Sequence, residues 1–537
     1  MKKRALAITL AAACMMTSLA GCGQRAGSEG ASSAVSGNSG GAKSEAAGEA
    51  GQGEEKDNVT VACAAEPDVF FSWYSKSNSN MDEVPMLHNM YETPIKLGPN
   101  NEHEPLLATE WSISEDGCTY TLKLRDDVYF HNGEKMTAED VEFTLDGAGH
   151  TSAGAAQLAN YDDCKVIDDT TVEIHLTAPY GPFLNALAGR FALIMDKSHY
   201  EEVGEDGYNE NPIGTGPYKF AERVSGDHVT LEAFDKYWGG EPSIKTVTLQ
   251  VLSDTNTQMI SLENEDVDVL INANISALNN LTTDKVKYET KDASSICNFK
   301  FNCNNGPAKD VNFRKAVLSA INKEDVNIGV YDGKATVADI PIATGFSGRP
   351  DEGTYNTLEY NMDKAKEYLA QSNYNGEEFK IACVSGTKDE SAAQIIQGQL
   401  MELGINCVVN ATDSSSYFAT VEQSGDYGAQ LRFAGVSVLD ADGLFYQYHS
   451  SQLLSNGKYD GGTWNEELDA KLQEARVEVD PEARKLMYVD VCNNILENAY
   501  GTAIYYDLNA VAYNTNLEGV IPRSLTGLYF FNDWNWK

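Results

Sequence analysis

The chain has 537 residues, of which 42% are hydrophobic and 22% are charged. This length exceeds the roughly 250–300 residues at which a single hydrophobic core stops growing, so we expect at least two lobes. The composition is ordinary for a globular protein and excludes a wholly disordered or collagen-like chain. Asp and Glu number 80 and Lys and Arg number 40, so the formal net charge is −40. Such an acidic chain argues against nucleic acid as a partner, because phosphates are bound through clustered Lys and Arg.

The N-terminus has the pattern of an export signal. Residues 2–4 are basic, and the apolar segment 5–13 is too short to span a bilayer as a mature helix. The segment Leu19-Ala20-Gly21-Cys22 follows, and it resembles a bacterial lipobox. We therefore expect a signal peptide at residues 1–21 and a lipid on Cys22. The alternative is an ordinary secretory signal in which Cys22 is a chance residue.

Residues 22–57 are predicted to be a flexible linker. They are mostly Gly, Ser, Ala and Glu, with almost no large apolar side chain to offset the entropy cost of ordering. No later segment approaches about 18 consecutive apolar residues. The sequence thus predicts a globular body that a lipid anchor holds at the outer face of the bacterial cytoplasmic membrane.

Strand and helix signals alternate along the globular body. An Asn132-Gly133 turn precedes Thr137-Ala138-Glu139-Asp140, which has the pattern of a capping box at the start of a helix. Alternating apolar residues predict strands at residues 59–63, 118–124, 171–176 and 246–251. This mixture indicates α and β structure in more than one lobe.

Residues 378–409 contain a βαβ pattern. Two predicted strands, at residues 378–384 and from residue 405 onward, are joined by a helix that ends at Gly404. This order predicts a parallel pair of strands with a right-handed crossover.

Two helices and two strands are expected near the C-terminus. The first helix covers residues 468–479, and the second begins at Pro481. Helical spacing predicts that the second helix turns four residues inward, namely Leu486, Val489, Cys492 and Leu496. Strands at residues 502–506 and 510–513 close the chain.

The cysteines have the pattern of core residues. Eight remain once Cys14 and Cys22 are set aside, and Cys297 alternates in phase with Phe299 and Phe301 along a predicted strand. We therefore expect mostly free, buried thiols, with a disulfide framework as the alternative. No Cys-x-x-Cys pair occurs, so no structural zinc site is expected.

No catalytic constellation is found in the sequence. The histidines form no His-x-x-x-His pattern, and Pro217 in Gly214-Thr215-Gly216-Pro217 lacks the N–H group that a phosphate loop offers. Ser455 and Lys458 match the Ser-x-x-Lys of penicillin-binding enzymes without its companion motifs. We predict that the chain is not an enzyme and carries no cofactor or metal. An exported serine acyl-enzyme that uses Ser455 and Lys458 is the alternative from another class.

Four segments of the globular body carry characteristic motifs. They are residues 105–141 with Phe130-His131-Asn132-Gly133, the turn Ile213-Gly214-Thr215-Gly216-Pro217-Tyr218, residues 301–322 with Phe313-Arg314-Lys315-Ala316, and residues 468–484 with Asp480-Pro481-Glu482-Ala483-Arg484. These segments resemble the family 5 extracytoplasmic solute-binding proteins, the peptide-binding components of ABC importers, and follow that family's order across residues 58–520.

This resemblance implies an α/β, two-lobed periplasmic-binding-protein-like fold of type II, with mixed sheets flanked by helices and a hinge between the lobes. The first lobe is expected at residues 58–297 and 505–537, with an inserted subdomain near 96–211, and the second lobe at 298–504. The family's ligand binds in the cleft between the lobes and favours closure. The implied partners are a small solute and the ABC permease, and the implied state is a monomer.

Peptide binders of this family carry a Gly-Trp-x-x-Asp segment whose Asp pairs with the ammonium group of the peptide. Here the segment reads Gly435-Val436-Ser437-Val438-Leu439-Asp440, so the Trp is missing and the acid comes one residue late. In an extended chain this offset turns a side chain to the opposite face unless a bulge restores it. Asp440 is the first candidate for the amine anchor and Asp442 the second, with solvated loop residues as the alternative.

Other candidate ligand contacts rest on position and residue type. Phe70, Trp73 and Tyr74 follow the first strand, where aromatic faces suit peptide side chains or sugar rings, and core packing is the alternative for each. Arg432 suits a carboxylate, with a surface ion pair as the alternative, and Tyr446 lies in the next loop. The favoured ligand is a short peptide, and an oligosaccharide or a metal chelate is the alternative on the same fold.

Overall fold

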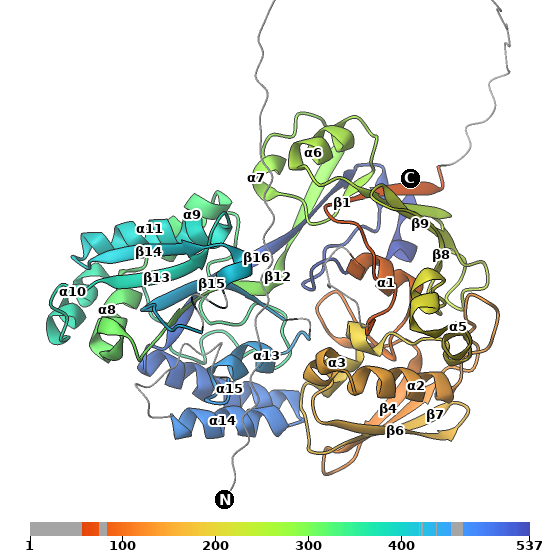
Figure 1. Ribbon diagram of the computed structural model, residues 1–537, viewed down its shortest axis with the longest axis horizontal. Helices are drawn as coiled ribbons and strands as arrows, with labels where there is room; N and C mark the ends of the chain where they lie inside the picture. Colours follow the sequence, from red (N-terminus) through yellow and green to blue (C-terminus); the bar gives the residue numbers. More distant parts are fainter. Residues whose placement is uncertain are drawn as a thin grey trace, which may run out of the picture. The chain divides into compact units, whose positions relative to one another are not determined.

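The computed structural model describes residues 56–74, 83–417, 419, 421, 423–436, 438–452 and 465–537 (Figure 1). The predicted signal peptide, Cys22, the predicted linker up to residue 55, Ser455 and Lys458 lie outside the described residues. Within the described part of the chain, no helix is both long enough and apolar enough to cross a membrane.

A ten-stranded mixed sheet organises the protein, in the order β14-β13-β15-β12-β16-β11-β1-β10-β9-β8. Its strands are β1 (Asn58–Cys63), β8 (Tyr218–Val224), β9 (His228–Ala233), β10 (Thr246–Val251), β11 (Val269–Leu270), β12 (Val286–Phe301), β13 (Phe379–Val384), β14 (Cys407–Thr412), β15 (Ala429–Gly435) and β16 (Gly501–Asn514). We call β11, β1, β10, β9 and β8 the β1 side of the sheet, and β14, β13 and β15 the β13 side.

The long strands β12 and β16 connect the two sides (Figure 1). Residues 286–292 of β12 pair with residues 508–514 of β16, next to β11. Residues 296–300 pair with residues 501–506 of β16, and residues 295–301 also pair with β15. The register shifts between Asp292 and Ile296, so a β-bulge lies where the strands pass from one side to the other. The sequence predicts two separate strands at residues 502–506 and 510–513. This prediction is wrong, because the polar residues between them also have strand geometry and β16 is one continuous strand.

The predicted βαβ unit is confirmed on the β13 side. Strands β13 and β14 are parallel and are joined by α11 (Lys388–Glu402), and Gly404 after the helix has a φ of 90°. The other helices of this part are α8 (Val311–Ala320), α9 (Lys323–Tyr331), α10 (Met362–Gln371), α12 (Ser414–Tyr417), α13 (Ala441–Phe445), α14 (Glu466–Val477) and α15 (Pro481–Glu497), with the short turns η3 (Gly306–Lys309) and η5 (Tyr446–Tyr448).

The inward face expected for α15 is only partly confirmed. Cys492 is buried as predicted, but Leu486 is 72% exposed and Val489 and Leu496 are only partly buried. The other buried positions of the helix are Arg484, Tyr488, Val491, Asn494 and Ile495. The sequence pattern misleads here because a charged residue occupies a fully buried position, and only a distant partner makes that burial possible.

A separate four-stranded sheet, which we call the β4 sheet, has the order β4-β5-β7-β6. Its strands are β4 (Ala108–Ile113), β5 (Thr119–Leu124), β6 (Tyr161–Asp168) and β7 (Thr171–Leu176). Helices α2 (Ala138–Gly149) and α3 (Ser152–Gln157) lie on one face (Figure 1), and α2 starts with the predicted capping box between Thr137 and Asp140. Nearby are β2 (Ile95–Leu97), β3 (His103–Pro105), α4 (Phe183–Leu187), η2 (Arg190–Ala192) and α5 (Lys197–Glu210).

Buried apolar side chains form three large clusters, centred on the β13 side, on the β1 side, and between the β4 sheet and α2. The β1 side is completed by α1 (Val84–Met90), α6 (Thr255–Glu263), α7 (Ile275–Leu278), β17 (Leu517–Glu518), η7 (Phe531–Asp533) and β18 (Asn535–Trp536). The eight cysteines of the described residues form no disulfide, and all but Cys118 are buried. The α/β class is thus confirmed, and the lobe and subdomain boundaries stay predictions.

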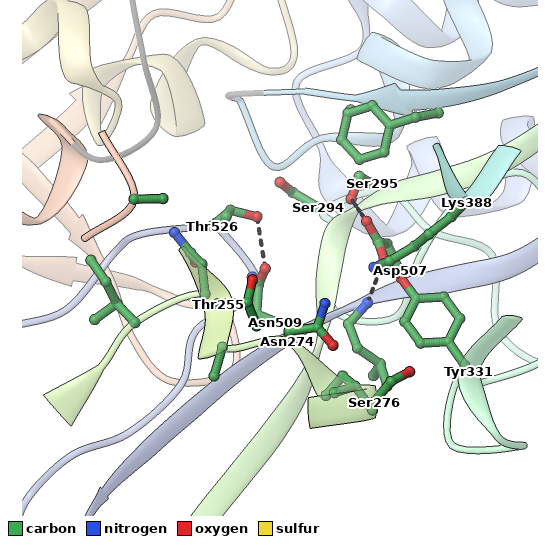
Figure 2. A pocket seen from close by; sticks show the side chains of 18 of the residues that line it. Thr255, Asn274, Ser276, Ser294, Ser295, Tyr331, Lys388, Asp507, Asn509 and Thr526 are labelled. Carbon is green, nitrogen blue, oxygen red and sulfur yellow. Dashed lines mark hydrogen bonds and ion pairs between the residues drawn. The ribbon is translucent and has the colours of Figure 1, made fainter. Parts of the chain in front are cut away.

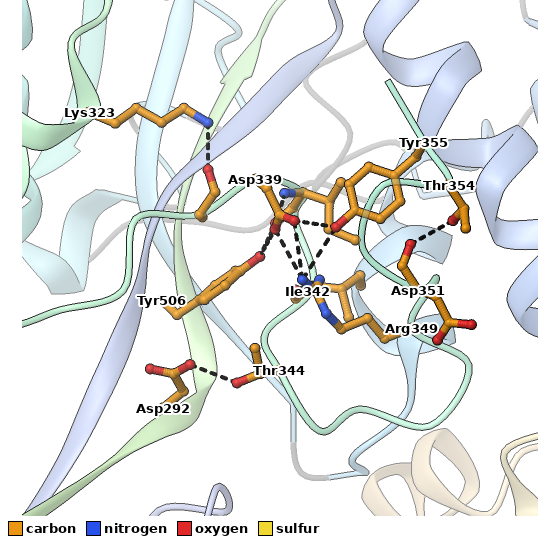
Figure 3. A network of polar contacts seen from close by, with 12 residues as sticks. Asp292, Lys323, Asp339, Ile342, Thr344, Arg349, Asp351, Thr354, Tyr355 and Tyr506 are labelled. Atoms are coloured by element: carbon orange, nitrogen blue, oxygen red, sulfur yellow. Dashed lines mark hydrogen bonds and ion pairs between the residues drawn. The ribbon is translucent and has the colours of Figure 1, made fainter. Parts of the chain in front are cut away.

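A polar network fixes the segment after α9 against β16 (Figure 3). Asp339 accepts hydrogen bonds from the hydroxyls of Tyr355 and Tyr506, and its Oδ1 lies 3.1 Å from Nη2 of Arg349. Burial acts to raise the pKa of Asp339, but these donors lower it to about 2. The carboxylate is therefore well compensated, and it holds the segment after α9 to β16.

Gly214 and Gly216 lie where the chain passes over the end of α1. A Cβ on Gly214 would lie 2.0 Å from the Met90 carbonyl oxygen, and one on Gly216 would lie 2.4 Å from the Asn89 oxygen. A close backbone approach, and not a positive φ, requires glycine at both positions.

Gly214→Ala is expected to lower the free energy of unfolding by about 2 kcal/mol, because the Met90 backbone cannot move away cheaply. The matched control is Gly398→Ala in α11, where no atom lies within 4 Å of the new Cβ. That change is expected to raise stability by about 0.5–1 kcal/mol. Urea unfolding followed by circular dichroism measures both, and equal midpoints for the two variants would contradict the prediction.

Candidate functional site

A cavity of about 740 Å³ lies beside the bulge of β12 and β16 (Figure 2). Helices α6 and α7 contribute to its wall on the β1 side, and α11 and β15 contribute on the β13 side. Ser294 and Ser295 of β12 and Asp507 and Asn509 of β16 lie between these walls. The volume is in the range of roughly 300–1,000 Å³ that is typical of pockets for small ligands.

Lys388 and Asp507 are the charged side chains of this cavity among the described residues. The Lys388 ammonium donates to the Tyr331 hydroxyl at 2.6 Å and lies 3.5 Å from Oδ1 of Asp507. Asp507 also accepts from the Ser295 hydroxyl at 3.4 Å and from the Leu508 N–H at 3.0 Å. Burial raises the pKa of Asp507 to about 6, so its ionised form is poorly compensated. Figure 2 shows these groups together on one side of the cavity.

Uncharged polar groups and one aromatic ring complete the cavity wall. Asn509 donates to the carbonyls of Arg523 and Ser524 and accepts from the Thr526 hydroxyl at 2.8 Å, so it is rigidly held. Asn274 caps α7 through Oδ1. Phe433 is 52% exposed although it lines the cavity, and it offers an apolar face to a ligand.

A second cavity of about 450 Å³ shares Gly435 and Val436 with the first. Three of the residues predicted from sequence, Asp440, Asp442 and Tyr446, line it together with Arg476 of α14. The Arg476 guanidinium lies 3.9 Å from the centre of the Tyr446 ring, and its Nη1 lies 3.7 Å from Oδ2 of Asp442. Burial raises the pKa of Asp442 to about 6, although Arg476 acts to lower it.

Asp440, the first candidate for the amine anchor, is engaged by protein groups. It is 1% exposed and accepts two hydrogen bonds from the Arg484 guanidinium, one of them at 2.8 Å. Its other partners are Nδ2 of Asn185 at 3.0 Å and the N–H of Asp442 at 2.9 Å. A carboxylate has about four lone-pair sites, so a ligand ammonium would have to displace one of these donors.

Burial acts to lower the pKa of Arg484, but the Asp440 carboxylate raises it above its ordinary value. Arg484 therefore stays charged although both side chains of the pair are 1% exposed. Asp440 also caps α13, so this single side chain connects α15, α13 and the α4 region.

The three aromatic candidates that follow β1 do not line the cavities described above. Phe70 is 2% exposed and packs edge-on against Phe220. Trp73 packs against Phe143 and Tyr200, and the Tyr74 hydroxyl donates to Asp206 at 3.0 Å. These positions match the core-packing alternative more closely than a ligand contact.

Arg432 is exposed and lines a further cavity of about 450 Å³ together with Lys388, Phe433 and Asp507. Its guanidinium lies 5.5 Å from the Tyr417 ring centre. This cavity adjoins the 740 Å³ cavity, since the two share three residues. Arg432 therefore lies within reach of a ligand that extends past Phe433.

Sequence reasoning missed Lys388 and Asp507. A signal was present for Asp507, because Asp507-Leu508-Asn509 is a polar interruption between two apolar strand patterns. Lys388 carried no comparable signal, since a lysine in the first turn of a helix is common on protein surfaces. Among the described residues, no group of three or more His, Cys, Asp or Glu side chains is arranged to hold a metal ion.

Arg484→Met is expected to lower the free energy of unfolding by about 3–5 kcal/mol, because it leaves the buried Asp440 carboxylate without its cation. Adding Asp440→Asn to this variant is expected to recover a large part of the loss, since the uncompensated charge is then gone. Urea unfolding of the wild type, the two single variants and the double variant gives the coupling free energy. Additive losses would show that the ion pair does not determine this region's stability.

Asp507→Asn is expected to raise the melting temperature at pH 7.5, by the equivalent of about 1–3 kcal/mol. The folded-state pKa of Asp507, about 6, is above its ordinary value of 3.8, so the folded state binds the extra proton and ionisation costs stability. The cost is complete above pH 6, and it disappears as the pH falls below about 4. Melting curves from pH 4 to pH 8 test this, and a gain that is equal at all pH values would contradict it.

The control is Asp413→Asn, which removes an exposed carboxylate whose pKa the hydroxyls of Ser415 and Ser416 lower to about 2. This variant is expected to show no gain in melting temperature at pH 7.5.

Comparison with known proteins identifies the family of the chain. Residues 102–455 match the family described as bacterial extracellular solute-binding proteins, family 5 middle. The oligopeptide-binding protein AppA of Bacillus subtilis (strain 168) is 28% identical over 519 residues, which cover 90% of this chain and 92% of that protein.

Solved structures give the same result. The ABC transporter substrate-binding protein CtaP of Listeria monocytogenes superposes with a TM-score of 0.80 at 25% identity, covering 90% of this chain and 100% of that one. Bacillus subtilis AppA in complex with a nonapeptide superposes with a TM-score of 0.69 at 26% identity, covering 90% and 99%. These similarities confirm the predicted periplasmic-binding-protein-like fold. The chain belongs to the bacterial extracellular solute-binding proteins of family 5.

Proposed function

We propose that this protein is the substrate-binding component of an ABC importer and captures a short peptide in the 740 Å³ cavity. Family membership supports solute binding outside the cell. A peptide ligand is supported by the oligopeptide-binding relative and by the nonapeptide bound to its solved structure. The observation that carries the proposal is that the cavity draws its walls from both sides of the sheet, at the strands that join them.

Under this proposal, β12 and β16 act as the hinge between the lobes. Two contacts join the region of α4 to the β13 side: Nδ2 of Asn185 donates to Asp440 at 3.0 Å, and the N–H of Gly181 donates to the Arg476 carbonyl at 2.9 Å. These contacts stabilise the closed arrangement. A ligand that touches both walls gains contacts only on closure, so it shifts the population toward the closed form.

The remaining predictions complete the proposal. A lipid on Cys22 anchors the protein at the outer face of the cytoplasmic membrane, and residues 22–57 tether the globular body. A monomer in the closed form presents the peptide to the membrane permease. A chain of this role makes and breaks no covalent bonds in its ligand.

The test is a thermal-shift screen of the purified protein against di- to hexapeptides, oligosaccharides and nickel chelates. A ligand that binds only the folded state raises the melting temperature in a concentration-dependent way, by about 2.7 kcal/mol of stability at 100 times its Kd. We expect peptides to give this shift.

A shift with sugars or chelates alone would leave the fold assignment intact and disprove peptide capture. Covalent labelling of Ser455 by a β-lactam would instead favour the acyl-enzyme alternative, and Ser455→Ala is the control for that labelling.

A further inference from the structure

We propose that Asp507 binds the primary ammonium group of the ligand, so that a free amino terminus is the feature that the 740 Å³ cavity recognises. This inference rests on the proposed peptide-binding function and names the anchor within it. Asp507 lies on β16 at the bulge, 67 positions after the Asp440 site at which the family resemblance implies the anchor.

Asp507 has unused hydrogen-bonding capacity that faces the cavity. Its side chain is 20% exposed, and it is the one carboxylate among the described residues that line this cavity. Its contacts with Lys388 and Ser295 are long, at 3.5 and 3.4 Å, and only the Leu508 N–H approaches closely. A carboxylate accepts about four hydrogen bonds, and the Leu508 N–H makes the one close contact here. An ammonium group with three donors can therefore take the remaining acceptor positions.

Asp440 differs from Asp507 both in its free hydrogen-bonding capacity and in its exposure. All of its lone pairs are used by Arg484, Asn185 and the Asp442 N–H, and it is 1% exposed. An ammonium group at Asp440 would have to separate a buried ion pair and leave the Arg484 guanidinium without its partner. An ammonium group at Asp507 would replace the long contact with Lys388 by a short hydrogen bond.

Lys388 is the competitor for Asp507. Its ammonium group is held by Tyr331, both by the hydrogen bond of 2.6 Å and by its position 4.3 Å from the ring centre. The lysine side chain is 54% exposed on a flexible stem, so it can move toward solvent when the ligand arrives. Lys388 therefore partly compensates the charge of Asp507 when no ligand is bound, and it does not block the ligand's access to Asp507.

The experiment compares the tetrapeptide that gives the largest thermal shift with its N-acetyl form, by isothermal titration. The proteins are the wild type, Asp507→Asn, Lys388→Met and the exposed-site control Asp413→Asn. Asn is isosteric with Asp, and melting curves verify that each variant is folded. Acetylation is expected to weaken wild-type binding by about 10- to 100-fold, the effect of one charged hydrogen-bonded pair.

In Asp507→Asn, we expect the free peptide to lose this preference, so that the two forms differ by less than about threefold. Lys388→Met removes the competing cation and is expected to tighten binding of the free peptide about two- to fivefold. Asp413→Asn is expected to behave as the wild type.

Peptide binding in which Asp507→Asn keeps the full preference for the free amino terminus would overturn this proposal and leave the proposed function standing. The same holds if the wild type binds both forms equally. If the wild type binds no peptide, the proposed function fails, and this proposal fails with it.

Discussion

The pairing of β12 with β16 is the constraint on which the rest of the structure depends. These strands pair with β11 at one end and with β15 at the other, so the ladders of both sides are built on the same two segments. Two neighbouring register shifts, between Asp292 and Ile296 and between Ile296 and Asn298, interrupt the ladder midway. A bulge bends and twists its strand and leaves groups unpaired, so it is a natural place for polar side chains that neither core covers. The cavity lies at this point, and its position is therefore a consequence of the strand topology.

Asp339, Asp440 and Asp507 show how three carboxylates of this fold differ in their hydrogen-bonding and ionic partners. Asp339 is surrounded by hydroxyl and guanidinium donors that lower its pKa to about 2. Asp440 is paired with Arg484 in the interior, where breaking the pair would leave an uncompensated charge. Asp507 has no comparable partner, and burial raises its pKa to about 6. A carboxylate such as Asp507, which lowers the stability of the fold and makes no strong structural contact, is a candidate for function. Selection for folding alone would replace it.

Local patterns in the sequence predicted local structure well. Alternation located β1, β5, β7 and β10, and the βαβ unit and the capping box of α2 followed from residues close together in the chain. The errors involve distant partners. The inward face of α15 is set by Arg484, whose burial depends on Asp440, 44 positions away. Asp507 approaches Lys388 from 119 positions away. A periodicity analysis treats charged residues as exposed, so it cannot find positions at which two distant charges, or a charge and a cavity, make burial possible.

The location of Asp507 on β16 also limits how far an ammonium group bound there could drive closure of the lobes. A contact favours closure only if it is stronger in the closed form, and β16 belongs to both sides of the sheet, so an ammonium group on Asp507 is held in either arrangement. Under the proposed lobe closure, the driving contacts would come from groups that only the closed form brings together around the ligand. Phe433 on the β13 side and Asn274 on the β1 side are such groups, since they face the cavity from opposite walls. The anchor would thus set which chemical end is recognised, whereas the length and side chains of the ligand would decide whether the lobes close.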